Sequence, residues 1–491
     1  MAQYLVVGQS HLAQEIGERL RALGLDAALL ALGEASPRTR DSWAPLPILE
    51  QGWDDARLPL ACGLAEAEVV MVCLEDDAAN LALALELAER HPRLRIQISL
   101  SHPNLAREVC QNLAASSRIT AYSPEELVAP SFALSALRNG VVHGVEHRGR
   151  FLAITDRPDL PHAHKLGPGL ALVEAERLTA EPELLEEVQR TAERLLNSAR
   201  MNPDRFLLVL IALVGAVLGS ATCFFHIHEH ISWITAFYFV VTTFCTVGYG
   251  DISLKDSDAL AKFVGIALML ASMTLTAGLF AILTNALVQK RADLLEGRRR
   301  FRFERHVVIC GIGALGIRIA DALARLRVRV LVIERSRDNE FLDELNRNQI
   351  PFMVADATRE SSLDRANLRR VRSLVCCIPD DLTAFEIALS ARGIRPNLHV
   401  VLRIAGDSFA LRLQKAFGFH AAHSVANLAA PSVLARALAP DALLLLEIAG
   451  VWKLLVPLDA GNPGGHQPVG DPEWNLGLVD VPRPAAARRA S

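Results

Sequence analysis

The hydrophobic pattern divides the chain into three regions. In the middle, residues 206–225 and 263–288 form two long runs without a formal charge. The first matches the length of a helix that crosses the hydrocarbon core, and the second allows for tilt. On both sides, short apolar strands alternate with helical stretches, which is typical of a parallel, doubly wound sheet. The pattern therefore predicts two α/β lobes around a membrane region.

A third uncharged run, 231–250, lies between the two long ones. Basic residues cluster before the first run and after the last, whereas the connection holds only Lys255 and Lys262. By the positive-inside rule both flanks face the cytoplasm, which requires an even number of spans. We therefore expect two spanning helices, both termini on the cytoplasmic side of the cell (inner) membrane, and a middle run that re-enters without crossing.

The middle run ends in the motif TVGYGD at residues 246–251. Ser232 is a good N-cap for a short helix over 233–244 that would precede the motif. A filter for dehydrated K⁺ needs stacked rings of backbone carbonyls, so alternate residues must take left-handed angles that glycine adopts easily. The sequence predicts a selectivity filter with K⁺ at Thr246, Val247, Gly248 and Tyr249, and with Gly250 completing the turn.

A nucleotide-binding pattern opens the second lobe. Gly311, Gly313 and Gly316 form a GxGxxG turn between an apolar strand and a helix, where a phosphate would lie at the helix N-terminus. Glu334 closes the next strand, where a carboxylate accepts from ribose hydroxyls and disfavours a 2′-phosphate. With Asp356 as a further contact, these residues predict NAD(H) or an adenine nucleotide as ligand.

The two lobes are an internal duplication. Residues 122–137 align with 423–438, so that Pro130-Ser131 corresponds to Pro431-Ser432. The first lobe retains only Gly8 of the three glycines, which favours a structural or dimer-forming role. We expect these boundaries: 1–160, first lobe; 161–204, linker with an amphipathic helix; 205–289, pore; 290–305, charged linker; 306–460, second lobe; 461–491, flexible tail.

Composition narrows the function classes. The formal net charge of −4 argues against a globally basic nucleic-acid binder, so no nucleic-acid partner is expected. Eight cysteines in 491 residues do not form a disulfide scaffold, and no zinc-type spacing occurs. The N-terminus lacks the features of a secretory signal peptide. The lipid bilayer remains the partner that the composition supports.

On these motifs the middle region resembles the potassium channel pore family, and both lobes resemble the regulator-of-K⁺-conductance (RCK) domains, especially over residues 355–367. Cys245 departs from the usual pore pattern. The resemblance implies an α-helical membrane pore (two transmembrane helices plus a re-entrant pore helix) flanked by two α/β Rossmann-like doubly wound RCK domains. It also implies a homotetramer whose eight lobes form a gating ring.

The predicted function is a potassium-selective channel, not an enzyme, gated by a nucleotide. Three alternatives stay open. The first is gating by Ca²⁺, although Arg403 and Ala405 stand where calcium-activated relatives carry acidic residues. The second is a membrane-anchored oxidoreductase that uses the nicotinamide chemically, although its catalytic groups and substrate domain are missing. The third is a nucleotide sensor beside a non-conducting pore.

Overall fold

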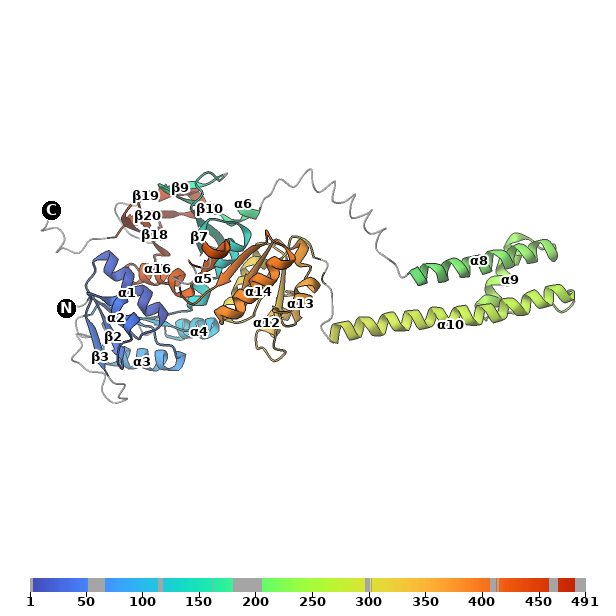
Figure 1. Cartoon of the computed structure of the whole chain (residues 1–491), viewed down its shortest axis with the longest axis horizontal. Helices are drawn as coiled ribbons and strands as arrows, with labels where there is room; N and C mark the ends of the chain where they lie inside the picture. Colours follow the sequence, from blue (N-terminus) through green and yellow to red (C-terminus); the bar gives the residue numbers. More distant parts are fainter. Residues whose placement is uncertain are drawn as a thin grey trace. The chain divides into compact units, whose positions relative to one another are not determined.

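A computed structural model describes residues 3–51, 67–113, 118–160, 162–179, 205–295, 301, 303–406, 412, 415–458 and 467–481 (Figure 1). These residues form two compact units. One comprises both ends of the chain, within 1–181 and 300–491, and the other lies within 182–299.

Each lobe is built on a six-stranded parallel sheet. In the first lobe the order is β3-β2-β1-β4-β5-β6, with strands Ile48–Gln51, Ala27–Leu32, Tyr4–Val7, Val69–Val72, Arg95–Ser99 and Ile119–Tyr122. In the second lobe it is β13-β12-β11-β14-β15-β16, with strands Phe352–Val354, Val330–Glu334, Val307–Cys310, Ser373–Cys376, His399–Arg403 and Ala421–His423. The two orders correspond strand by strand, which confirms the doubly wound prediction and the duplication.

Helices cover both sheets. The first lobe contains α1 to α5: His11–Leu23, Pro37–Trp43, Asp77–Arg90, Pro103–Leu113 and Pro124–Leu137. The second lobe contains α11 to α14 and α16: Ala314–Arg325, Leu342–Arg347, Glu360–Arg365, Asp381–Ile394 and Val425–Leu438. In α5 and α16 most residues are buried, which is typical of a helix that is apolar on most sides.

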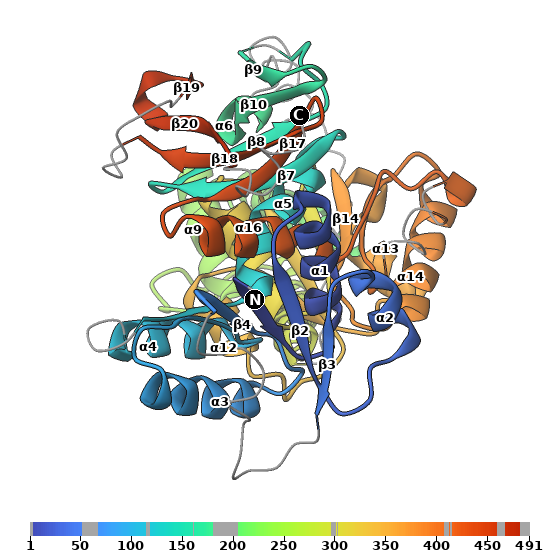
Figure 2. The same ribbon diagram turned by 90° about the vertical axis from the view of Figure 1, so that its left-hand side faces the viewer.

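The last helix of each lobe packs against the other lobe. α5 contacts α11 and strands β14 and β15, while α16 contacts α1, and α5 and α16 lie side by side (Figure 2). Hydrogen bonds also join each of these helices to the other lobe. Arg19 in α1 donates to the side chain of Asn427 in α16 at 2.7 Å, and Arg372 donates to the carbonyl of Leu137 in α5 at 3.0 Å. The two lobes therefore share one hydrophobic core.

A four-stranded antiparallel sheet follows each parallel sheet and corrects two predicted boundaries. The first has the order β7-β8-β10-β9, with strands Val141–His147, Arg150–Thr155, Leu170–Glu174 and His164–Gly167, and is followed by α6 at Ala175–Thr179. The second has the order β17-β18-β20-β19, with strands Leu444–Ile448, Val451–Pro457, Leu476–Asp480 and Gln467–Val469.

The boundary predicted at residue 160 is thus wrong, because β9 and β10 belong to the same sheet as β8. The predicted flexible tail is wrong for residues 467–481, because β20 pairs with β18 and Trp474 is buried in a core that the two four-stranded sheets share. Pro468 and Gly477 there lie within strands β19 and β20, and Gly470 lies between the two strands. The amphipathic helix predicted within 161–204 lies outside the described residues.

The other unit, called the pore unit here, consists of three helices over residues 205–295. They are α8 (Arg205–His228), α9 (Trp233–Phe244) and α10 (Ala259–Leu295) (Figure 1). A small core joins them, in which Phe225 of α8 meets Phe239 of α9 edge-to-face at 5.0 Å. Among the residues whose side chains are described, Ala259–Gly278 is long and apolar enough to cross a bilayer, and Ala212–His228 is apolar but shorter.

Candidate functional site

The filter motif follows directly from α9, which begins at its predicted position. The hydroxyl of Ser232 accepts from the amide of Thr235 and caps the helix. After Cys245 the backbone alternates: Thr246, Gly248 and Gly250 have φ values of 58°, 49° and 78°. The two glycines were predicted to be left-handed. Thr246 was not, because a residue with a Cβ rarely adopts that conformation.

The amides of the motif turn back toward the helix. Val247 and Gly248 both donate to the carbonyl of Thr242, at 2.9 and 3.2 Å, and Thr246 donates to Thr243 at 3.1 Å. Within the described pore unit, the carbonyls of residues 246–249 accept no hydrogen bond. Residues 245–250 are exposed in the single chain, so these oxygens are open to a cation. One chain supplies one column of such oxygens.

Tyr238 of α9 interacts electrostatically with Asp251, which follows the last glycine of the motif. The end of the extended segment therefore lies close to the helix from which it departs.

Large apolar side chains of the pore unit are exposed in the single chain. Tyr249 is 71% exposed and Ile234 is 83% exposed. Others are Trp233, Phe237, Val247, Leu260, Phe263, Ile266, Met269, Leu270, Met273 and Phe280. A soluble monomer rarely exposes so much contiguous apolar surface. Lipid or further copies of the chain would cover it.

The second lobe contains a cavity of about 460 Å³ at the carboxyl ends of its strands. It lies where β11 and β14 adjoin, the point at which the strand order reverses and where such sheets bind ligands. The cavity is lined by Gly311, Gly313, Glu334 and Asp356 among the predicted residues. Its volume falls within the usual range for small-molecule sites.

The three glycines of the turn have different surroundings. Gly311 has a φ of 88°. A Cβ on Gly316 would lie 2.4 Å from the carbonyl oxygen of Gly311, so this position serves close packing and does not line the cavity. A Cβ on Gly313 would meet nothing within 4 Å, and no side chain caps α11 at this residue. The free amides of the helix N-terminus thus face an open space that fits a phosphate.

Glu334 is the last residue of β12, and Asp356 lies just after β13. The two Glu334 oxygens accept from the amides of Ile312 and Ser336, at 2.8 and 2.9 Å, so the carboxylate holds the glycine turn and keeps further lone pairs for a ligand. Asp356 accepts from both the amide and the hydroxyl of Thr358. The Thr358 hydroxyl, as the largest cause, lowers the pKa of Asp356.

Two cations of this cavity were missed by the sequence interpretation. Arg335 follows β12 directly and Arg403 ends β15, and both line the cavity. In the sequence, Arg403 was considered only as a residue that cannot serve as a calcium ligand. Its position at the carboxyl end of a parallel strand could have identified it, because all such ends meet at one edge. With Asp380, which also lines it, the cavity combines three acids, two guanidinium groups and an uncapped helix.

The equivalent turn of the first lobe is occupied by its own side chains. Ser10 caps α1 by accepting from the amide of Ala13 at 3.3 Å. Gln9 bridges to the loop after β2, donating to the carbonyl of Glu34 at 3.1 Å and accepting from the amide of Ser36 at 3.0 Å. These bonds use the groups that a nucleotide phosphate and ribose would need.

Among the described residues, no group of three or more histidine, cysteine, aspartate or glutamate side chains is arranged to hold a metal ion. His306, His399, His420 and His423 lie in or next to strands β11, β15 and β16. His306 donates its Nε2 hydrogen to the carbonyl of Ala366 at 2.9 Å, so its role in the described structure is a packing one.

Comparisons with known proteins match both motifs. Residues 208–289 match the ion channel family, and residues 307–427 match the TrkA-N domain family. The filter motif falls within the first match, and the glycine turn within the second. The region before residue 208, including the first lobe, lies outside both matches.

Several relatives are potassium channel proteins of prokaryotes. Probable potassium channel protein 2 of Methanocaldococcus jannaschii is 24% identical over 220 residues, 43% of this chain and 63% of that protein. Potassium channel protein 1 of the same organism is 27% identical over 217 residues, 43% of this chain and 62% of that protein. The chain thus spans less than two thirds of the length of these relatives.

A solved structure of the GsuK channel has the same fold. It superposes on 89% of this chain and 63% of its own with a TM-score of 0.50 at 12% identity. Together with the two family matches, this likeness confirms the predicted fold class, in which a helical pore region is flanked by Rossmann-like lobes.

Proposed function

We propose that this chain, which joins an ion-channel domain to a TrkA-N domain as prokaryotic potassium channels do, is the subunit of a potassium-selective channel gated by a nucleotide. The observation that carries the proposal is the alternating backbone at Thr246, Gly248 and Gly250. It turns successive carbonyls to one side while the amides of Val247 and Gly248 are satisfied by Thr242.

Four chains are needed for conduction. A filter site surrounds a dehydrated K⁺ with carbonyl oxygens from several sides, and one chain supplies one side. The exposed apolar residues of α9 and α10 support both a tetramer interface and lipid contact. The functional unit is a homotetramer in the cell (inner) membrane, with both termini in the cytoplasm and eight lobes beneath the pore.

Gating depends on the second lobe. The uncapped N-terminus of α11 would hold the phosphates, and Glu334 would accept from a ribose hydroxyl. NAD(H) or an adenine nucleotide fits this arrangement better than NADP, because Glu334 repels a 2′-phosphate. Binding shifts the pore equilibrium only if the open and closed states bind the ligand unequally. The reciprocal exchange of α5 and α16 would transmit a change in one lobe to the other.

Conduction is tested by K⁺, Rb⁺ and Na⁺ flux into liposomes that contain the purified full chain. We expect K⁺ and Rb⁺ flux well above Na⁺ flux. The variant Gly250→Ala should abolish it, because an L-residue at a φ of 78° is strained by about 1–2 kcal/mol in every subunit. Gly215→Ala, in α8 where a Cβ meets nothing within 4 Å, is the matched control. Equal Na⁺ and K⁺ flux would refute selectivity.

Gating is tested separately by single-channel recording with NAD⁺, NADH, ADP and ATP on the cytoplasmic side. We expect at least one nucleotide to change the open probability, and Gly313→Val, which would fill the open space at the turn, to remove the response without removing the current. A current that none of the four nucleotides changes would refute nucleotide gating but not potassium conduction. Sustained hydride turnover by the purified chain would favour the oxidoreductase alternative.

A further inference from the structure

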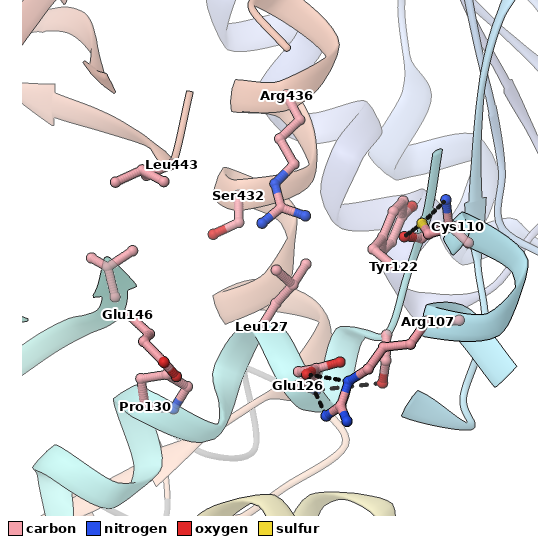
Figure 3. Close-up of a pocket in the computed structure, with 14 residues that line it drawn as sticks. Arg107, Cys110, Tyr122, Glu126, Leu127, Pro130, Glu146, Ser432, Arg436 and Leu443 are labelled. Carbon is pink, nitrogen blue, oxygen red and sulfur yellow. Dashed lines mark hydrogen bonds and ion pairs between the residues drawn. The ribbon is translucent and has the colours of Figure 1, made fainter. Parts of the chain in front are cut away.

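A second cavity, of about 270 Å³, lies between the two lobes (Figure 3). Its walls come from α4, β6, α5 and β7 of the first lobe and from α16 and the residue before β17 of the second. Neither the filter nor the nucleotide cavity includes these residues. Both lobes would therefore touch anything that occupies it.

One charged group of this cavity has no partner. The guanidinium of Arg436 extends from α16 toward the space between Ser432, Leu127 and Tyr122 (Figure 3). Within the described part of the chain it forms no ion pair and donates no hydrogen bond. Burial lowers the pKa of Arg436. The carboxylate of Glu126 interacts with Arg436 electrostatically but is paired with Arg107. A desolvated cation without an ion pair of its own is unfavourable, so the site favours an additional anion.

The other charges around the cavity are already compensated. Arg107 pairs with Glu126 at 2.7 Å, and Glu146 pairs with Arg325 of α11 at 2.6 Å. The remaining polar groups include the hydroxyl of Ser432, for which no partner occurs among the described residues. Arg436 is thus the one uncompensated charge on the described lining.

The duplicate interface supplies an internal reference. Ser135 of α5 occupies the position of Arg436, and the two backbones are held alike: His399 contacts the carbonyl of Ser135 at 2.6 Å, and Arg95 donates to the carbonyl of Arg436 at 3.0 Å. The side chains differ. The Ser135 hydroxyl is bonded to His423 at 3.0 Å, whereas the long Arg436 side chain ends in a cavity.

We propose that this cavity binds a small organic anion whose carboxylate pairs with Arg436 and Ser432. Its apolar part would lie against Leu127, Pro130 and Leu443, which line the remainder. A guanidinium binds a carboxylate through two parallel hydrogen bonds, which suits the free end of Arg436. The ligand would be distinct from the nucleotide, and its binding does not depend on whether the pore conducts.

The test uses the purified full chain and isothermal titration at constant ionic strength, with benzoate as the probe and benzamide as its neutral counterpart. We expect benzoate to bind saturably and benzamide not to bind. Arg436→Ser, which installs the residue found at the duplicate position, should weaken benzoate binding about tenfold or more, since a charged hydrogen-bonded contact is lost. Arg403→Ser, in the nucleotide cavity, should leave it unchanged.

The melting temperature of Arg436→Ser without ligand separates binding from folding. It should not fall below that of the wild type, because the arginine side chain has no ion pair or hydrogen bond among the described residues to lose. Anomalous density from 4-bromobenzoate beside Arg436 would locate the site. Equal binding of benzamide, wild-type affinity in Arg436→Ser, tighter binding of inorganic phosphate than of benzoate, or absence of benzoate binding would each overturn the proposal.

Discussion

The two lobes share a strand order and an exchanged helix, yet their phosphate turns differ. In the second lobe the N-terminus of α11 is uncapped and opens into a cavity of about 460 Å³. In the first lobe Ser10 caps α1 and Gln9 bridges to the next loop. Packing residues therefore maintain the duplicated fold, whereas a few turn residues determine whether a ligand can enter.

The two exchanged interfaces differ in the same way. The sheet of the second lobe presents His399 and His423 to α5, whereas the sheet of the first lobe presents Arg95 and Tyr122 to α16. One interface therefore contains two imidazoles whose pKa is lowered to about 4, and the other contains an arginine and a tyrosine at the corresponding positions. Four experiments test these differences between the two lobes.

The largest effect is expected from pH. Burial is the main cause that lowers the pKa of His399 and of His423 to about 4, so the unfolded chain binds these protons more tightly than the folded chain. Their contribution is present above a pH of about 6.5 and is lost as the pH falls toward 4, by about 3 kcal/mol per histidine. The melting temperature of the full chain should fall over this range.

The control for this prediction compares the two interfaces. His423→Gln should flatten the pH dependence, whereas Arg95→Gln at the equivalent interface should leave its slope unchanged. A melting temperature that does not fall as the pH is lowered would contradict this prediction. So would an equal dependence of the melting temperature on pH in His423→Gln and the wild type.

The next effect is overpacking at the third glycine. Gly316→Ala should destabilise the second lobe by about 1–3 kcal/mol, because the new Cβ would lie 2.4 Å from the carbonyl oxygen of Gly311. The first lobe already carries Ala13 at this position, so Ala13→Gly there should cost only about 0.5–1 kcal/mol. Thermal unfolding of both variants measures the difference, and equal losses would show that the two turns pack alike.

A smaller change in stability but a clear change in binding is expected for Gly313→Ser. The new serine can cap α11 as Ser10 caps α1, because no atom lies within 4 Å of the added Cβ. We expect unchanged or slightly raised stability and nucleotide binding weakened about tenfold or more. Titration with NAD⁺ and ADP checks this. Wild-type affinity would mean that the phosphate does not use this helix terminus.

The smallest effect is expected for the reciprocal change, Ser10→Gly. It removes the cap of α1 and should lower stability by only a few tenths of a kcal/mol. Nucleotide binding should not appear, because Gln9 still bridges to the loop after β2. Binding of a second nucleotide per chain would show instead that the cap alone closes the first lobe.

Much of the molecule could be predicted from sequence. The alternation of strands and helices in each lobe, the capped helix at Trp233–Phe244 and the left-handed glycines Gly248 and Gly250 occur as predicted. Each follows from local rules, namely apolar periodicity, capping chemistry and the conformational freedom of glycine. The grouping of Gly311, Gly313, Glu334 and Asp356 around one cavity followed from the order of strands in a doubly wound sheet.

Only the tertiary structure decided the rest. Periodicity shows that α5 and α16 are apolar on most sides, but not which lobe covers them. Composition suggested a flexible tail where Leu476–Asp480 pairs with a distant strand. Arg436 and Tyr122 are far apart in the chain and meet only because the last helices are exchanged. Contacts of this kind depend on long-range packing, which local sequence rules do not encode.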